Sequence, residues 1–377
     1  MNKKNVEIIR VEGCDKIAIF IPSLTGGGAE RIMVNLANAL IQEKIKVDLV
    51  LAKVEGPYIN DVANGVNIVD LDSKRVLTSL PKLVRYLRKE KPASILAAME
   101  HANIVALWAT KIARVKTRVI MTVHNSLSQI VNKSTMRGLI YLSLIRLFYP
   151  FANAVVVVSK EARKDFLKMT NLDSQNVKVI YNPVVTSEIY KKSKVLVEHP
   201  WFAPGEPPVI LGVGRLSKQK DFSTLLKAFA IVRNQLKARL LIIGEGSERR
   251  NLEKLADELG CKDDVDLHGF VHNPYAYMAQ ATVFVLSSAW EGLPTALIES
   301  LAIGIPVIST DCPSGPREIL QNGKYGILVP IGEPGQLAVS IMEVIQDKKV
   351  PTYTANAVAP FTLDASVNKY LRVLNCR

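Results

Sequence analysis

The chain has 377 residues, enough for two domains of the usual size of about 100–200 residues each. Apolar residues make up 48% and charged residues 22%, a globular composition that excludes long disorder, a collagen-like chain and a disulfide scaffold. The 48 Lys and Arg residues outnumber the 35 Asp and Glu residues, and the formal net charge of +13 favours an acidic partner: phosphate, a membrane surface or nucleic acid.

Targeting and membrane signals are weak. The first residues, MNKKNVEIIRVEG, lack the apolar run of a signal peptide, and the four widely separated cysteines favour a reducing compartment. Leu139–Val158 is long enough to span a bilayer, but Arg146 and Pro150 interrupt it. We therefore expect a buried helix followed by a strand, in a cytoplasmic protein.

In the first half of the chain, β-branched runs alternate with helical patterns. A glycine loop and a helix over Glu30–Ile41 follow the first run. The predicted strands are Lys16–Ile21, Val47–Leu51, Asn67–Leu71, Ser94–Ala97, Arg118–Val123, Ala154–Val158 and Val177–Ile180. Strands interleaved with helices predict a parallel sheet covered on both faces, and hence a first domain over residues 1–183.

The alternation of strand and helix patterns stops at residues 184–207, which are predicted to form a linker. It resumes over residues 208–358, the predicted second domain. Strands are predicted at Pro208–Val213, Arg239–Ile243, Val265–Leu267, Thr282–Leu286, Pro306–Ser309 and Gly326–Val329. Helices are predicted at Phe222–Gln235, Ser247–Leu259, Pro274–Ala279, Pro294–Ala302, Pro316–Leu320 and Gly335–Gln346. A final helix is predicted over Leu363–Leu374, within a C-terminal segment, residues 359–377, that is expected to pack back toward the first domain. The fold class is therefore α/β, with two doubly wound, Rossmann-like domains facing a cleft.

Ligands of open α/β sheets lie beyond the carboxyl ends of the strands, so the loops that follow strands are the candidate sites. In the first domain, PSLTGGGAE places Gly27 and Gly28 directly before a helix, where a backbone can approach an anion. His124 ends a strand in TVHNS, on the side of the proposed cleft. The alternatives are a tight turn without a ligand and a satisfied, partly buried histidine.

The second domain has two candidate loops. GVGRLSKQKD brings Gly214, Arg215 and Lys220 to one helix start, where two cations would suit a diphosphate. EGLPTALIE places two carboxylates near the next helix start, and they suit sugar and ribose hydroxyls. This second loop contributes Glu291, Gly292, Leu293, Pro294, Thr295 and Glu299. Pro294 is expected at the first helical position. The alternatives are solvated loop cations and acids that stabilise the helix dipole or lie exposed.

A metal site is not expected. Asp264 and Asp266 match a DxD pattern, but they start a strand, at the end of the sheet away from the predicted sites. No Cys/His pair has metal-ligand spacing.

Taken together, these loops resemble retaining glycosyltransferases of family 4, with the GT-B fold. Arg215 with Lys220, Glu291 and Glu299 with seven residues between them, the GGGAER segment, the histidine after a first-domain strand and CPSGPREIL all fit that family. The resemblance covers essentially the whole chain.

The resemblance implies a nucleotide-diphosphate sugar, UDP- or GDP-linked, bound mainly by the second domain. Arg215 and Lys220 would hold the diphosphate, and Glu299 the ribose. Glu291 with Gly292–Thr295 would hold the donor sugar and phosphate. The backbone of Gly269–Val271, which includes Val271, would border the base. Gly27 and Gly28 would approach the diphosphate, and His124 the transferred sugar. No metal or other cofactor is implied.

The first domain would then bind the acceptor, a glycan or a polyprenyl-linked glycan of cell-surface polysaccharide biosynthesis. Ser73–Pro92 and Met136–Phe151 are apolar stretches with basic residues, which suggests peripheral binding to the inner face of the membrane; the alternative is core helices with a solvated basic face. Two other function classes stay open, a non-transferase GT-B enzyme such as a nucleotide-sugar epimerase and a basic nucleic-acid-binding protein, although no aromatic-rich basic patch supports the latter.

Overall fold

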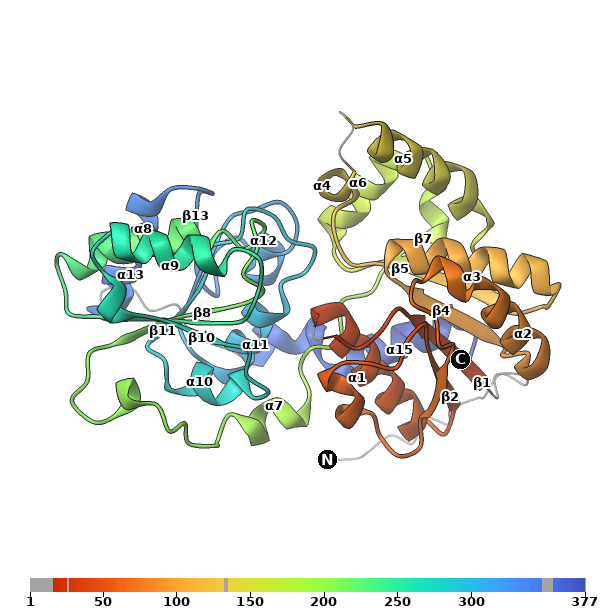
Figure 1. Ribbon diagram of the computed structural model, residues 1–377, viewed down its shortest axis with the longest axis horizontal. Coiled ribbons are helices and arrows are strands. Elements are labelled where there is room, and N and C mark those ends of the chain that lie inside the picture. Colours follow the sequence, from red (N-terminus) through yellow and green to blue (C-terminus); the bar gives the residue numbers. More distant parts are fainter. Residues whose placement is uncertain (1–15, 26, 132–134, 348–354, 377) are drawn as a thin grey trace. The chain divides into compact units, whose positions relative to one another are not determined.

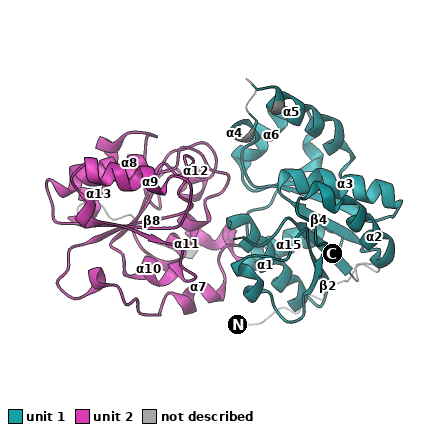
Figure 2. Ribbon diagram, in the orientation of Figure 1, with its two compact units in different colours: residues 1–183, 363–377 teal, residues 184–362 magenta. Residues whose placement is uncertain are grey.

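The computed structural model describes residues 16–25, 27–131, 135–347 and 355–376 (Figure 1). The chain forms two compact units, unit 1 from Met1–Pro183 with Leu363–Arg377 and unit 2 from Val184–Thr362 (Figure 2). Residues 184–207 are not a separate linker as expected. They belong to unit 2, as do residues 359–362, so the C-terminal segment joins unit 1 from Leu363, a few residues later than predicted, whereas the final helix predicted over Leu363–Leu374 is present as α15 (Leu363–Val373).

Unit 1 is built on a seven-stranded parallel sheet of order β3-β2-β1-β4-β5-β6-β7. Its strands are β1 (Lys16–Ile21), β2 (Lys46–Leu51), β3 (Asn67–Asp70), β4 (Ser94–Ala98), β5 (Arg118–Val123), β6 (Ala154–Val157) and β7 (Val177–Val179). Each predicted strand is present within one or two residues, because a strand buried on both faces reads as a continuous apolar run.

Helices cover both faces of this sheet (Figure 1). They are α1 (Gly28–Gln42), α2 (Leu80–Glu90), α3 (Glu100–Ala113), α4 (Leu127–Ile130), α5 (Met136–Phe148), α6 (Lys160–Thr170) and α15 (Leu363–Val373). Short 3-10 turns are η1 (Pro57–Asp61), η2 (Leu77–Ser79), η3 (Tyr149–Phe151) and η4 (Ser174–Asn176). Leu139–Val158 is thus a helix, a turn and a strand, as expected.

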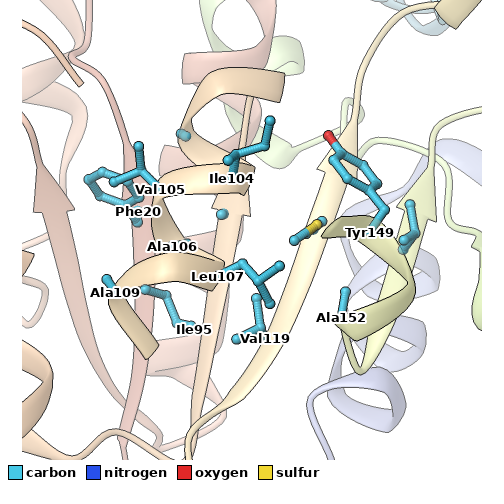
Figure 3. Close-up of a cluster of buried hydrophobic side chains, with 14 of the residues drawn as sticks. Phe20, Ile95, Ile104, Val105, Ala106, Leu107, Ala109, Val119, Tyr149 and Ala152 are labelled. Carbon is cyan, nitrogen blue, oxygen red and sulfur yellow. The ribbon is translucent and has the colours of Figure 1, made fainter. Parts of the chain in front are cut away.

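The core of unit 1 lies between the sheet and these helices. Ile104 and Leu107 of α3 pack over Phe20, Ile95 and Val119 of the strands, and all five side chains are buried (Figure 3). The expectation that Ser73–Pro92 offers a membrane-facing apolar surface is wrong for α2, because its apolar side chains are buried in the same core.

Unit 2 repeats the architecture with a six-stranded parallel sheet of order β10-β9-β8-β11-β12-β13. Its strands are β8 (Val209–Val213), β9 (Arg239–Ile243), β10 (Val265–Gly269), β11 (Val283–Leu286), β12 (Val307–Thr310) and β13 (Ile327–Val329). Its helices are α7 (Ser187–Lys192), α8 (Phe222–Arg233), α9 (Arg249–Glu258), α10 (Pro274–Gln280), α11 (Thr295–Ile303), α12 (Pro316–Ile319), α13 (Pro334–Ile345) and α14 (Ala355–Val358). Its 3-10 turns are η5 (Pro200–Phe202), η6 (Lys262–Asp264) and η7 (Ala359–Phe361).

Two further properties bear on the sequence-based expectations. Among the described residues, no helix is both long and apolar enough to cross a bilayer. Cys261 and Cys312 are free thiols, whereas Cys376 is disulfide-bonded, so the cysteines do not all support the reducing compartment that their spacing favours.

The packing of α8 predicts how unit 2 responds to core truncation. Phe229 is fully buried, whereas Ile231, on the same helix, is 36% exposed. Phe229→Ala should lower the free energy of unfolding by about 3–5 kcal/mol, because it removes a large buried side chain and leaves a cavity. Ile231→Ala should cost under about 1 kcal/mol. Urea unfolding followed by circular dichroism measures both, and equal losses would contradict the packing described for α8.

Candidate active site

The strand order of unit 2 reverses between β8 and β11, which are adjacent in the sheet. Connections from these two strands leave in opposite directions, and the crevice so formed is where open α/β sheets bind ligands. The loop after β8 carries Gly214, Arg215 and Lys220, and the loop after β11 runs to Pro294. The two predicted loops of the second domain thus flank the switch point.

An ion pair joins these loops. Lys220 Nζ lies 2.6 Å from Glu291 Oε1, and the Ser288 hydroxyl donates to the same oxygen at 2.6 Å. The side chains of Lys220 and Glu291 are only 18% and 6% exposed. Charge-assisted bonds in a partly dry setting are stronger than exposed ones, so Glu291 holds the ammonium in a fixed position. The sequence analysis missed Ser288, whose signal was its place at the end of β11.

Three more hydrogen bonds fasten the loop after β8 to the loop after β11. The Ala289 N–H donates to Gln219 O at 2.8 Å, and the Gln219 amide donates to Trp290 O at 3.0 Å. The Ser287 hydroxyl donates to Lys220 O at 2.8 Å. Two chain segments about seventy residues apart therefore behave as one rigid site wall.

Arg215 is a second cation of this loop. Its side chain is exposed, and no described residue pairs with it. Its backbone is held in place by close contact with the loop after β9, where a Cβ on Gly244 would lie 2.0 Å from Gly214 O and one on Gly246 2.2 Å from Leu216 O. Only glycine permits that approach.

The two helix starts differ in their capacity to bind an anion. Asp221 caps α8 itself, since its Oδ1 accepts the Thr224 N–H at 3.3 Å and its Oδ2 the Thr224 hydroxyl at 2.6 Å. α11 has no side-chain cap; it begins at Thr295, so Pro294 is the N-cap residue and not, as expected, the first helical one. The open positive end of a helix dipole is therefore that of α11.

The EGLPT loop is braced from behind by the CPSGP segment. The Ser314 hydroxyl donates to Gly292 O at 2.9 Å, and Gly315, at φ +101°, passes so close that a Cβ would lie 2.6 Å from Pro294 Cδ. This packing fixes the backbone of Gly292, Leu293 and Pro294 before any ligand arrives.

Glu299 is not an exposed helix glutamate, which was the alternative to a binding role. It is 2% exposed, and the Tyr275 hydroxyl of α10 lies 3.4 Å from its Oε1. Burying a carboxylate costs free energy unless hydrogen bonds or a ligand replace its lost hydration. The burial of Glu299 beside the switch point therefore supports a binding role. Val271 lies in the loop after β10, two strands and so about 10 Å from β8.

In unit 1 the strand order reverses between β1 and β4. Gly27 is the N-cap of α1 and Gly28 its first residue. The buried carboxylate of Glu30 folds over Gly27, where a Cβ would lie 2.1 Å from Oε2, so this helix start already has a neighbouring negative charge. Met99, after β4, has φ +80°, a strained value for a large side chain of the kind found at functional loops. Sequence patterns gave no signal for it.

His124 directly follows β5, which pairs with β4, and its hydrogen bonds determine its tautomer. The Thr122 hydroxyl donates to Ala97 O, so Thr122 Oγ1 must accept from His124 Nε2, 3.0 Å away. Nδ1 therefore carries the lone pair; it is buried and has no partner among the described residues. Burial lowers the pKa of His124 to about 4. The ring is thus a neutral hydrogen-bond acceptor, ready for a hydroxyl.

The two aspartates of the DxD pattern do not converge. Asp264 forms ion pairs with Arg233 and Arg239, whereas Asp266 lies 3.1 Å from His199 Nε2 and 2.9 Å from His268 Nδ1. His199, Asp266 and His268 form the one group of potential metal ligands found among the described residues.

Hydrogen bonding argues against a metal at this group. His199 Nδ1 accepts the Trp201 N–H, so Nε2 must carry the proton that points at Asp266. A metal-binding imidazole instead donates through its second nitrogen. The group therefore ties η5 to β10.

Comparison with known families decides the class. The profile described as "Glycosyl transferases group 1" matches residues 198–359, and that of "Glycosyltransferase Family 4" matches residues 26–188. The chain belongs to glycosyltransferase family 4. The glycosyltransferase activity and GT-B fold that the sequence implied are confirmed.

Relatives agree with this assignment. An N-acetylgalactosaminyltransferase of Campylobacter jejuni, named for a diphospho-undecaprenol-linked acceptor, is 29% identical, with 89% of this chain and 91% of that protein covered. LpsE of Rhizobium meliloti, a lipopolysaccharide core glycosyltransferase, is 27% identical over 92% and 96% of the two chains.

Among solved structures, Anabaena HepE with UDP and glucose has a TM-score of 0.78 at 20% identity, covering 96% of this glycosyltransferase and 99% of that chain.

The geometry at His124 predicts its titration. With its pKa near 4, against about 6.5 in an unfolded chain, the ring should stay neutral down to about pH 5. NMR of 13C-labelled imidazoles measures this, and the His124→Gln variant identifies the resonance. Folded stability contributed by this group should be complete above about pH 6.5 and fall as the pH drops toward 4. A midpoint near 6.5 would contradict the described environment.

Proposed function

We propose that this glycosyltransferase moves a sugar from a UDP-linked donor to a lipid-linked glycan, with retention of anomeric configuration and without a metal ion, at the inner face of a membrane. The observation that carries the donor assignment is the wall of unit 2, where Arg215, Lys220 and the open N-terminus of α11 surround one switch point. UDP and a UDP-sugar bound to structural neighbours support the choice of base.

In the proposed reaction, negative charge develops where Arg215 and Lys220 lie. As the bond between the anomeric carbon and the diphosphate oxygen breaks, the leaving group gains negative charge. Lys220, held by Glu291, acts as a preorganised cation for that charge, and Arg215, which has no acidic partner among the described residues, supplies a second positive charge. The acceptor hydroxyl forms the new bond to the anomeric carbon, and its proton passes to the leaving diphosphate.

Retention is supported by the family and by the absence of a free base in the described wall. Glu291 Oε1 already accepts from Lys220 and Ser288, and Glu299 is buried beside Tyr275. Glu299 is assigned to the ribose, and Gly292–Thr295 to the donor sugar and phosphate. In unit 1, His124 Nδ1 is assigned to a hydroxyl of the transferred sugar, and Gly27 and Gly28 to the diphosphate.

The lipid-linked acceptor is supported by relatives whose names contain a diphospho-undecaprenol acceptor, and by α5. Five large apolar side chains of α5 and the adjoining η3 are 46–72% exposed: Met136, Leu139, Ile140, Leu147 and Phe151. Most recur at helical spacing on one side of α5, and Lys111 stacks over the Phe151 ring. A bilayer would cover such a face and offer the acceptor chain.

The donor wall predicts a split between binding and chemistry. Arg215→Ala and Lys220→Ala should each lower kcat and kcat/KM by about 10²-fold or more, because their charge matters most in the transition state. Glu299→Ala should mainly raise the donor KM, because a ribose contact changes little during reaction. Steady-state kinetics at saturating acceptor, with folding checked by circular dichroism, decide it. Near-wild-type turnover in the first two variants would overturn the site.

Metal independence gives a second prediction. Because cations of the protein face the diphosphate, activity should survive excess EDTA with less than about a twofold change. The assay compares EDTA-treated enzyme with the same enzyme given Mg²⁺ or Mn²⁺. Complete loss, restored by either ion, would disprove the metal-free mechanism while leaving the donor assignment in place.

The exposed face of α5 gives a third prediction. Ile140→Ser with Leu147→Ser should weaken co-sedimentation with anionic phospholipid vesicles about tenfold, since each side chain loses its burial in the acyl region. Leu196→Ser with Val339→Ser, two exposed apolar residues of unit 2, is the matched control and should bind like wild type. Equal binding by both double variants would remove α5 from the membrane contact.

A further inference from the structure

Unit 1 contains a basic hollow that neither the donor nor the acceptor assignment uses. It has a volume of about 460 Å³ and is lined by residues at the amino ends of β5, β6 and β7 and by α15. Four cationic side chains line it, Arg118, Lys178, Lys369 and Arg372, and no carboxylate of the described residues does.

This hollow is separate from the catalytic edge of the sheet. Arg118 begins β5, and His124 follows the end of the same strand. Five residue steps of a strand place the two ends roughly 16 Å apart. The hollow therefore lies on the opposite edge of the sheet from the loops assigned to catalysis.

Arg118 and Asn153 give the hollow a fixed floor. Arg118 Nε is buried and has no hydrogen-bond partner among the described residues. Asn153 Oδ1 accepts the Val119 N–H at 2.7 Å, so its amide is held with the NH₂ group left as donor. Keeping a partly buried guanidinium without a counter-charge is costly, and an anion in the hollow would lower that cost.

α15 supplies the second wall in a rigid form. Lys369 and Arg372 are three residues apart and so share one side of the helix. The helix is anchored on unit 1 by the Ser94 hydroxyl, which donates to Leu374 O at 3.0 Å, and by the Ser366 hydroxyl, which donates to Tyr181 O at 2.7 Å. Its backbone position therefore needs no ligand to order it.

Among the described residues, no acid pairs with Arg118, Lys178 or Arg372, and Lys369 lies over the Tyr181 ring. Four like charges around one hollow repel each other unless an anion of matching charge enters. Two guanidinium forks and two ammonium groups match phosphate oxygens, and the amides of Asn153 and Gln175 suit neighbouring hydroxyls.

We propose that this hollow is a second ligand site, which binds a phosphorylated anion of at least two charges away from the catalytic edge. The ligand is either a soluble phosphorylated metabolite or the headgroup of an anionic lipid.

Hydrogen–deuterium exchange tests this on the full-length enzyme, with pyrophosphate as the soluble probe. Exchange should slow in peptides covering residues 174–180 and 366–374. The Lys178→Gln/Arg372→Gln variant should require about tenfold more pyrophosphate for the same protection, or show none. The Lys164→Gln/Lys168→Gln variant, which removes two exposed charges of α6, should behave like wild type. Peptides covering residues 212–222 report donor-site binding separately, so failure of either site is distinguishable.

Vesicles identify the source of the ligand. If phosphatidylglycerol vesicles protect residues 174–180, phosphatidylcholine vesicles do not, and pyrophosphate competes, the ligand is a lipid headgroup. Protection by pyrophosphate alone indicates a soluble metabolite. Arg118→Lys, which keeps the charge but loses the guanidinium fork, should weaken protection without disturbing exchange in α3. No protection by either probe, or equal loss in the α6 control, would overturn the proposal.

Discussion

The ion pair between Lys220 and Glu291 is the contact on which the donor wall depends. It links two loops that the fold alone only brings near each other, and it does so at 2.6 Å with both side chains largely removed from water. Buried pairs of this kind contribute little net stability, because desolvation offsets the attraction. The value of this ion pair is positional: the Lys220 ammonium is held in one place, which in the proposed reaction is where the leaving diphosphate gains charge. Arg215, on the same loop, has no acidic partner among the described residues and is proposed to complete that site.

Sequence reasoning reached the architecture because parallel strands buried on both faces read as short apolar runs between helical patterns. It placed most strands within one or two residues, and the order of loops gave the switch-point residues. It failed for the supporting side chains of the site. Ser288 and Thr122 contact residues two or three positions away, and Tyr275 contacts Glu299 from another helix, but hydrophobic periodicity indicates burial and not which polar side chains pair.

Linker composition was equally misleading at residues 184–207. These residues are rich in polar and turn-forming types, yet Ile189 is fully buried and Trp201 and Phe202 pack against the core of unit 2. A few large side chains were enough to dock the segment, since each buried aromatic side chain outweighs several polar neighbours. The prediction of a membrane-facing surface for the basic stretch around α2 failed for a similar reason. The apolar side of α2 faces the sheet, and only the surrounding fold reveals which side of an amphipathic helix is covered.

The net charge of +13 becomes informative only after the paired cations are removed. Arg233 and Arg239 are engaged by Asp264, Arg249 by Glu245, and Arg317 by Asp311. Those pairs serve the structure at the surface of unit 2. Arg215, by contrast, has no acid among the described residues, and neither do Arg118, Lys178 and Arg372. Where such cations converge, their combined positive potential attracts an anion from solution. The proposed donor site of unit 2 and the hollow at the amino ends of the unit 1 strands share this property.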